Sequence, residues 1–321
     1  MEEKERVDHP ILSLCIPTNG VTEWVLQVLD SIYKENPDQS CFEVVIEDNG
    51  SNEEFEKKVQ EYRRTFQNIH YYKSSANGFL CQIDSFKHAQ GEFIKFVNHR
   101  SRFTEGTLEY FIRFAEQNHT EKPVVFFSNG QVKSTETDSF DAFVAKLGCY
   151  SSWSGGLAFW KSDLEIIDSL PKYNALFPHT DVLFARRKAA KYLVDGREVF
   201  SDIIAGHGSK GNYNLFQAFA VEYPSIFSDM LRDGSITVET FLSVKDSMLD
   251  LLAEFYIDFI IRKKNASYSF ESYDQYLQVY YSKAQLKSRI IKKLVLGGFE
   301  KFFRKIKAKL VSFRRKTESH S

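Results

Sequence analysis

The pattern of apolar and polar residues near the start of the chain predicts two strands with a helix between them. Residues 11–18 and residues 42–51 are short apolar runs that stop at polar, turn-forming residues. Residues 23–34, between them, carry apolar side chains at helical spacing. This order predicts a β-α-β unit with parallel strands. Loops at the carboxyl ends of such strands form the ligand crevice of an open α/β sheet.

Similar patterns continue along the chain. Further helices and strands are predicted over residues 52–67, 69–72, 80–89, 91–100, 107–118 and 124–127. From Val238 onward the pattern is helical. The sequence therefore predicts an α/β domain over residues 1–230, with a mixed, mostly parallel sheet flanked by helices. A helical C-terminal region is predicted over residues 231–321.

The two strand ends carry an ordered pair of motifs. The first strand ends in I-P-T and the second in E-D-N-G-S, and no glycine-rich phosphate loop follows either one. This pair resembles the start of a family 2 glycosyltransferase, whose Rossmann-like fold is called GT-A. The resemblance implies that Thr18, Glu47 and Asp48 line the pocket for the base and ribose of a sugar nucleotide, and that Pro17 and Asn77 belong to the same donor site. In the alternative interpretation, the acidic pair only caps a strand and starts the next helix.

The position of the family's metal motif has an unusual composition. Family members carry D-x-D or D-D-D there, and these carboxylates hold a divalent cation on the donor diphosphate. Here Asn98, His99, Arg100 and Ser101 occupy the position. Either the site is inactive, or His99, Arg100 or Arg102 neutralises the diphosphate directly, as arginine does well. No metal ligand is assigned; Mg²⁺ or Mn²⁺ stays open as a cofactor, and His99 as a structural turn residue is the third interpretation.

A segment near residue 181 carries a candidate catalytic base. Residues 177–187 resemble the family's E-D-x-x-L-x-x-R segment, whose aspartate is the general base. Asp181 matches that aspartate, while Thr180 replaces the glutamate. A base must remove the proton of the acceptor hydroxyl. His179 is the alternative base, because imidazole titrates near neutral pH, and a role for Asp181 only in starting the helix is a further interpretation.

Small residues between two tryptophans indicate the acceptor side of the site. In the family, a small-residue segment here forms the floor under donor sugar and acceptor, so Gly155 and Gly156 are predicted acceptor-binding residues. Trp153 is predicted to join them, because indole rings stack on sugars, with core packing as its alternative and as the expectation for Trp160. The loop over residues 206–214 either closes over the donor or is a surface connection.

Charge is unevenly distributed along the chain. Residues 283–316 hold 13 basic residues and one acidic residue, although the whole chain has a net charge of −1. Apolar residues spaced by 3 and 4 form a stripe on the basic helix predicted over residues 287–316. This combination is typical of a helix that lies on an anionic membrane surface. The alternative is a solvated helix packed on the domain, and nucleic-acid binding is not expected because the rest of the chain is acidic.

The remaining composition indicates a cytoplasmic protein. The four cysteines have no C-x-x-C spacing, no signal peptide is recognised, and no apolar run approaches the ~18 residues that span a bilayer. The resemblance implies an inverting glycosyltransferase of the hexosyltransferase type, peripheral at the inner face of the cell membrane. It is expected to move a sugar from a nucleoside diphosphate donor, with UDP favoured, to a lipid-linked glycan in bacterial capsule or other surface polysaccharide synthesis. The alternative is a catalytically inactive, sugar-nucleotide-binding partner of another transferase.

Overall fold

A computed structural model of the chain describes residues 9–203 and 212–295. The chain divides into two compact units. The first consists of residues 1–208 and 225–244, and the second of residues 209–224 and 245–321. Within the described residues, no helix is long and apolar enough to cross a membrane.

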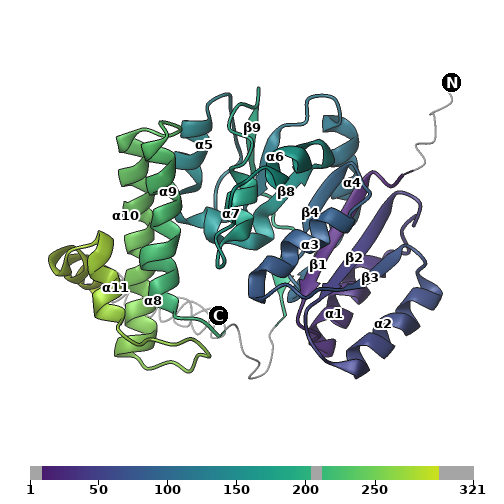
Figure 1. Cartoon of the computed structure of the whole chain (residues 1–321), viewed down its shortest axis with the longest axis horizontal. Helices are drawn as coiled ribbons and strands as arrows, with labels where there is room; N and C mark the ends of the chain where they lie inside the picture. The colour runs from purple at the N-terminus through teal and green to yellow at the C-terminus, as the bar shows by residue number, and fades with distance from the viewer. Residues whose placement is uncertain (1–8, 204–211, 296–321) are drawn as a thin grey trace, which may run out of the picture. The chain divides into compact units, whose positions relative to one another are not determined.

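An eight-stranded mixed sheet forms the centre of the first unit (Figure 1). Its strands are, in spatial order, β3 (Ile69–Lys73), β2 (Phe42–Asp48), β1 (Leu12–Thr18), β4 (Phe93–Phe96), β8 (Leu157–Trp160), β6 (Val124–Phe127), β9 (Tyr192–Asp195) and β7 (Thr135–Thr137). Strand β8 runs antiparallel to both neighbours and β7 antiparallel to β9, while the other pairs are parallel. The mixed, mostly parallel sheet predicted from the sequence is therefore confirmed. A second, two-stranded sheet pairs β5 (Ser101–Phe103) with β10 (Phe200–Asp202).

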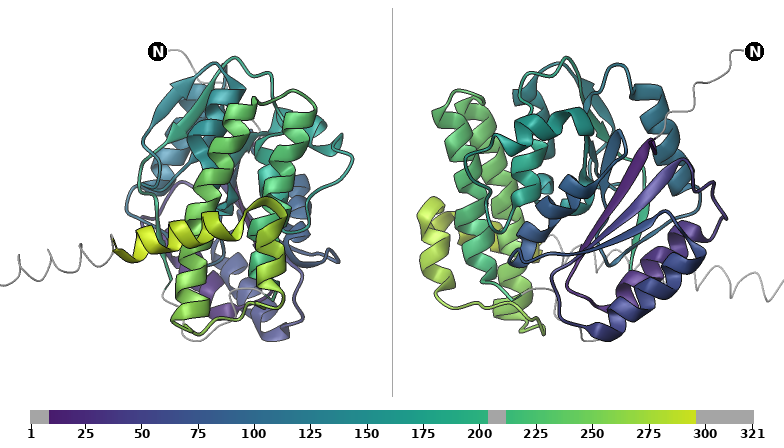
Figure 2. Two further views of the ribbon diagram at one scale, coloured as in Figure 1. Left: turned by 90° about the vertical axis from the view of Figure 1, so that its left-hand side faces the viewer. Right: turned by 45° about the vertical axis from the view of Figure 1, so that its right-hand side comes forward.

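Helices cover both faces of the large sheet. The helices of the first unit are α1 (Thr22–Tyr33), α2 (Glu53–Thr65), α3 (Cys81–His88), α4 (Thr107–Asn118), α5 (Phe140–Leu147), α6 (Leu164–Asp168), α7 (Pro178–Leu183) and α9 (Tyr223–Arg232). On one face, Leu12, Leu14 and Ile16 of β1 join the aromatic and aliphatic side chains of α1, α2 and α4 in one core cluster. Figure 2 shows α1 and α2 side by side along this face. Helices α3 and α7 lie beside each other away from that cluster (Figure 1).

Local sequence explains where these elements begin. Asn52 caps α2, because its side chain accepts hydrogen bonds from the backbone N–H groups of Glu54 and Phe55. Three glutamates follow in the first turn of α2 and two arginines lie in its last turn, in the order that the helix dipole favours. Pro178 starts α7, where its missing N–H has no cost.

The strand order indicates where a ligand is expected to bind. From β1 the chain proceeds outward through β2 to β3, and then returns to β4 on the other side of β1. The order of strands thus reverses between β1 and β4. In open α/β sheets, ligands bind outside the carboxyl ends of the strands at such a switch point.

The described part of the second unit is helical, in agreement with the C-terminal helices predicted from the sequence. It contains α8 (Leu215–Gln217), two π-helical turns (Ala218–Glu222 and Tyr256–Ile261), α11 (Tyr273–Tyr280) and the part of α10 (Val238–Phe255) from Lys245 onward. A further helix begins at residue 283 and is described as far as residue 295. The predicted tail from residue 296 to residue 316 lies outside the described residues.

Candidate active site

Thr18 and His99 meet across the switch point. Thr18 is the last residue of β1, and His99 follows β4. The Oγ1 atom of Thr18 lies 2.9 Å from Nδ1 of His99 and also accepts a hydrogen bond from the backbone N–H of Gly20. Burial, reinforced by the nearby Arg100, lowers the pKa of His99 to about 3. His99 is therefore a neutral hydrogen-bonding group at pH 7, and positive charge at this position comes from Arg100 and Arg102.

Trp24 of α1 completes this cluster. The indole ring meets the His99 ring edge to face, with the ring centroids 5.2 Å apart. The Arg100 guanidinium lies over the same indole, 5.3 Å from its centroid, in cation–π contact. In the sequence, Trp24 is one of the apolar residues of the helix predicted over residues 23–34. Trp24 lies in the first turn of the helix that follows the strand ending in Thr18. This position is the sequence signal that could have identified it as a site residue.

Asp48, at the end of β2, is buried and held by three donors. Its Oδ1 accepts from the backbone N–H of Gly50, at 2.8 Å. Its Oδ2 accepts from the Tyr71 hydroxyl and the Lys73 ammonium of β3, each at 2.8 Å. The carboxylate is therefore fixed in place beside Thr18, with which it is paired in the sheet register.

Glu47 precedes Asp48 in the strand and points to the opposite face. Its Oε2 lies 2.8 Å from Nδ1 of His88 in α3, while its Oε1 is buried without a partner among the described residues. Burial raises the pKa of Glu47, and the contact with His88 opposes this shift. Because successive side chains of a strand alternate between faces, the structure does not bring Glu47 and Asp48 together.

Pro17 and Asn77 lie next to these strand ends. Pro17 pairs with Glu47 in the register of β1 and β2. Asn77 is exposed, in a turn before a short 3-10 helix. The side chain of Asn49 donates to the backbone oxygens of Ala76 and Gly78, at 3.0 and 3.1 Å. These bonds tie the turn that carries Asn77 to the end of β2.

The position of the metal motif has no acidic ligand. Asn98 accepts a hydrogen bond from the backbone N–H of Arg100, which closes a tight turn after β4. Ser101 then starts β5, where it is paired with Asp202 of β10. Among the described residues, no group of three or more histidine, cysteine, aspartate or glutamate side chains could hold a metal ion. Residues 204–211, which include most of the predicted loop over 206–214, lie outside the description.

Asp181 lies near the start of α7 in a setting that weakens its acidity. Its Oδ2 accepts a hydrogen bond from the backbone N–H of Asn174 at 2.5 Å. Burial raises the pKa of Asp181 to about 6, although that hydrogen bond and the Arg187 charge act against the shift. A carboxylate with this pKa is ionised at neutral pH and can accept a proton.

Two residues next to Asp181 attach α7 to a segment earlier in the chain, the 3-10 helix Gly148–Ser152. The ring Nε2 of His179 lies 2.9 Å from the backbone oxygen of Ser152, and Thr180 donates to that of Ser151 at 3.0 Å. Burial lowers the pKa of His179 to about 4. His179 is therefore neutral at pH 7 and a weaker base than Asp181.

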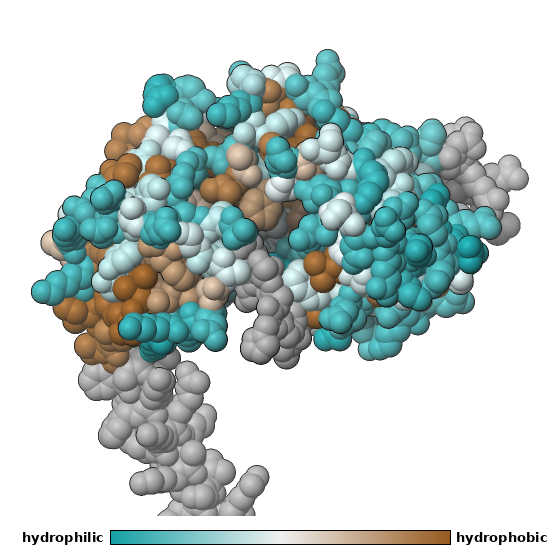
Figure 3. All heavy atoms as spheres, turned by 60° about the horizontal axis from the view of Figure 1, so that its bottom comes forward, coloured by the Kyte–Doolittle hydropathy of each residue, from teal (hydrophilic) through white to brown (hydrophobic). Residues whose placement is uncertain are grey.

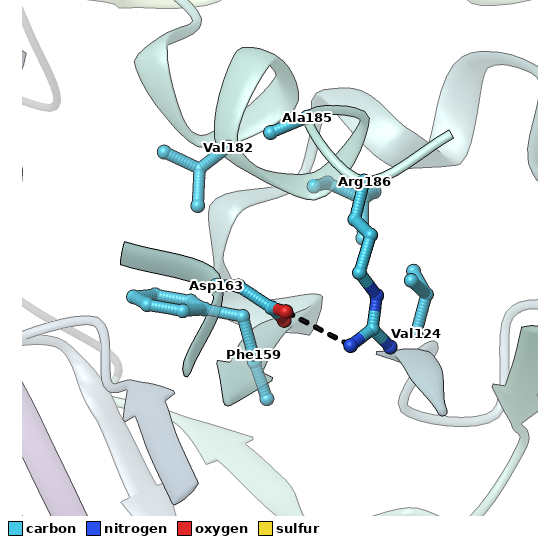
Figure 4. A pocket seen from close by; sticks show the side chains of 8 residues that line it. Val124, Phe159, Asp163, Val182, Ala185 and Arg186 are labelled. Carbon is cyan, nitrogen blue, oxygen red and sulfur yellow. Dashed lines mark hydrogen bonds and ion pairs between the residues drawn. The ribbon is translucent and has the colours of Figure 1, made fainter. Parts of the chain in front are cut away.

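An ion pair anchors the other end of α7 (Figure 4). Arg186 donates to Asp163 at 2.8 Å and also to the backbone oxygen of Lys122. Asp163 in turn accepts from the backbone N–H of Trp160. The cavity beside this pair has a volume of about 10 Å³, about one water molecule and far too small for a sugar. The pair therefore positions the helix that carries Asp181.

The predicted acceptor residues form a tightly packed segment. A Cβ atom on Gly155 would lie 2.4 Å from the Trp153 ring, and one on Gly156 would lie 2.2 Å from the Phe126 ring. Glycine is therefore required at both positions for this packing. Trp153 is partly buried against the core, and Trp160 is fully buried, with its ring N–H bonded to the backbone oxygen of Pro123.

Lys95 holds the backbone of this segment and was not among the predicted site residues. It lies in β4 with no exposed surface, and its Nζ donates to the backbone oxygens of Phe96, Gly155 and Leu157 at 2.9, 2.6 and 3.0 Å. Three phenylalanine rings lie 5.2–5.6 Å from the same atom. Burial lowers the pKa of Lys95, whereas three carbonyl acceptors match the three N–H bonds of an ammonium and favour the charged form. The signal in the sequence was a lysine in the middle of an apolar strand.

Comparison with known proteins identifies the class of protein that this fold and site represent. Residues 13–193, more than half of the chain, match the family described as "Glycosyl transferase family 2". The chain therefore belongs to this family.

Individual relatives are distant. An uncharacterized glycosyltransferase of Mycoplasma genitalium, MG060, is 26% identical over 111 residues, which cover 33% of this chain and 37% of that protein. TarS 1-349 of S. aureus, in complex with UDP-GlcNAc, superposes with a TM-score of 0.52 at 15% identity, covering 79% of this chain and 76% of that one. The chain spans 43% of the longer TarS structure. The mannosyltransferase PcManGT of Pyrobaculum calidifontis, in complex with GDP-Man and Mn²⁺, has a TM-score of 0.47 at 15% identity, covering 90% and 88%. The TarS match at this identity is a likeness of fold.

Proposed function

We propose that this chain is an inverting hexosyltransferase that moves a sugar from a UDP-sugar to a hydroxyl of a lipid-linked glycan, in the synthesis of a bacterial surface polysaccharide. The contact between Thr18 and His99 at the switch point, beside the fixed Asp48, carries the proposal. The TarS fold, solved with UDP-GlcNAc, supports the choice of a uridine donor. Release of UDP from UDP-sugars that depends on the presence of acceptor tests it. Binding of the donor without any turnover would favour an inactive partner protein instead.

The donor would span the ends of β1, β2 and β4. Asp48 and Thr18 offer hydrogen-bond acceptors to the base and ribose. Arg100, stacked on Trp24, offers a cation to the diphosphate. Arg102, which is exposed in β5, is the second candidate for that role.

Transfer would proceed by a single displacement. Asp181 accepts the proton of the acceptor hydroxyl while its oxygen attacks the anomeric carbon, and the bond from that carbon to the diphosphate oxygen breaks. The nucleoside diphosphate leaves with the electron pair, and the arginine side chains stabilise its charge. Attack from the face opposite the leaving group inverts the anomeric configuration.

A divalent cation does not fit the residues at the position of the metal motif. Mg²⁺ and Mn²⁺ prefer oxygen ligands, especially carboxylates. Here Asn98 already accepts a backbone hydrogen bond, His99 is in contact with Thr18, and the Arg100 cation is adjacent. No step of the proposed reaction therefore runs through a metal ion.

Two measurements test whether the site works without a metal ion: activity in the presence of EDTA, and UDP binding by Arg100→Ala. Activity is expected to survive EDTA, and Arg100→Ala is expected to weaken UDP binding about tenfold or more, because a charge-assisted hydrogen bond is lost. Isothermal titration calorimetry with UDP and with uridine measures this, since uridine affinity should change little. Arg113→Ala, on an exposed arginine of α4, is the matched control. EDTA inactivation that Mn²⁺ reverses would contradict the prediction.

Asp48→Ala tests the nucleotide pocket. The thermal stabilisation that UDP gives to the protein is expected to fall by at least about 1 kcal/mol, the value of a hydrogen bond to a charged group. Because Asp48 also holds Tyr71 and Lys73, each variant is compared with its own ligand-free form. Tyr71→Phe removes one of these donors and keeps the carboxylate, so it should retain the UDP effect. If UDP stabilises Asp48→Ala as much as it stabilises the parent protein, Asp48 does not contribute to UDP binding.

Membrane association is proposed from the charge distribution at the C-terminus. Truncation after Val295 removes eight basic residues and keeps the helix that starts at residue 283. The truncated protein is expected to lose most of its sedimentation with anionic vesicles, because each Lys or Arg near the surface contributes about 1 kcal/mol. Neutral vesicles are the control. If the full-length protein sediments equally with anionic and neutral vesicles, electrostatic attraction does not contribute to its membrane association.

A further inference from the structure

A cavity of about 460 Å³ lies in the second unit, far larger than the one beside Arg186. It is formed by the π-helical turn that starts at Tyr256, by α11 and by the helix that begins at residue 283. Most of its lining is apolar or aromatic, and includes Tyr256, Tyr273, Leu277, Tyr281, Leu286 and Ile290. Volumes between about 300 and 1,000 Å³ with such a lining are typical of ligand sites.

Two lysines at this cavity differ from the other basic residues of their helix. Arg289 forms ion pairs with Asp246 and Asp250 of α10, and Lys293 pairs with α10 as well. Lys283 and Lys287 line the cavity instead and are exposed. They have no ion-pair partner within residues 9–203 and 212–295, and Asp274 is the only acidic side chain in the lining. The cavity therefore combines an apolar interior with a net positive charge.

The surface around the cavity is also apolar. Val279, Ile291, Leu294 and Val295 are each 43–57% exposed, on α11 and on the helix from residue 283. Figure 3 shows hydrophobic side chains gathered over the C-terminal helices. Exposed apolar residues beside unpaired lysines suit contact with the acyl and phosphate layers of a membrane.

We propose that this cavity binds the hydrocarbon chain of an anionic membrane phospholipid, with the lipid phosphate held by Lys283 and Lys287. The proposal rests on the membrane association of the proposed function and adds to it a discrete, saturable site. Charge decides between this ligand and the chain's own C-terminal segment as the occupant. Residues 296–316 carry eight basic residues and one acidic residue, so the two lysines would repel them.

Calorimetric titration of the full-length protein with lysophosphatidylglycerol, below its critical micelle concentration, tests the site. One lipid is expected to bind per chain. The pair Lys283→Gln and Lys287→Gln should weaken binding about tenfold or more, and Leu286→Trp, which fills the cavity, should weaken it similarly. Lys292→Gln changes an exposed lysine of the same helix outside the cavity lining and should leave the affinity unchanged.

Each other result overturns the proposal. Unchanged binding by Leu286→Trp would mean that the lipid only adsorbs on the surface, and equal binding of glycerol phosphate would mean that no chain enters the cavity. Tighter lipid binding after truncation at Val295 would mean that the C-terminal segment is the natural occupant. UDP affinity is measured on the same preparations. If the parent protein binds UDP but not the lipid, only the proposed lipid site is wrong. If the parent protein does not bind UDP, the proposed function is wrong.

Discussion

Replacing Asp181 by asparagine is expected to lower kcat by about 10²- to 10⁴-fold while donor affinity stays unchanged. The amide keeps the shape of the carboxylate and can still accept the hydrogen bond from Asn174, but it cannot take a proton. Loss of a general base typically costs this much in rate. Single-turnover transfer and UDP titration, measured on the same variant, separate the two quantities.

The pH dependence of the parent supplies an independent check. The base must be ionised, and the pKa of Asp181 is raised to about 6. The rate is therefore expected to rise with pH, to be half-maximal near pH 6, and to level off at neutral pH and above. His179→Gln should keep this profile, because burial holds the pKa of His179 near 4 and its ring nitrogen is engaged with the Ser152 oxygen. A full rate in Asp181→Asn together with a large loss in His179→Gln would transfer the role to the histidine.

Local patterns were sufficient to predict the first two strands and the helix between them. The apolar runs predicted at residues 11–18 and 42–51 are β1 and β2, and the helix predicted at residues 23–34 is α1. Local signals of the same kind mark the next helix, where the Asn52 side chain caps α2. The short strands β5, β7 and β10 depend on partners 55 to 101 residues away, and no periodicity could indicate them.

The candidate site was less accessible from sequence because its chemistry depends on burial and on distant partners. Thr18 and Asp48 could be found, because they end consecutive parallel strands. The opposite orientation of Glu47 follows from strand alternation alone, and a stricter reading of the motif would have separated the two acids. The neutral state of His99 follows from burial and from the nearby Arg100. The residues that contact its ring, Trp24 and Thr18, lie 75 and 81 positions earlier in the sequence, and only the folded chain brings them together.

Replacing Lys95 by methionine is expected to destabilise the first unit by about 3 kcal/mol or more. Methionine fills a similar volume, but the three carbonyl oxygens that accept from the ammonium lose their donor, at about 1–3 kcal/mol for each buried group left unsatisfied. Differential scanning calorimetry should show a fall in Tm of roughly 6–12 °C for ~3 kcal/mol in a unit of this size.

Lys161→Met is the control that shows whether the expected loss of stability comes from the burial of Lys95 or from the removal of any lysine. Lys161 follows β8 and also donates to oxygen atoms, those of Gln90 at 3.1 and 3.3 Å, but it is partly exposed, so that water can replace it. Lys161→Met should therefore change the Tm by no more than about 2 °C, in the range of surface substitutions. If Lys95→Met were equally mild, the cost of desolvating the ammonium would have offset its three hydrogen bonds. Packing, such as that of Gly155 against Trp153, would then position this segment without help from the lysine.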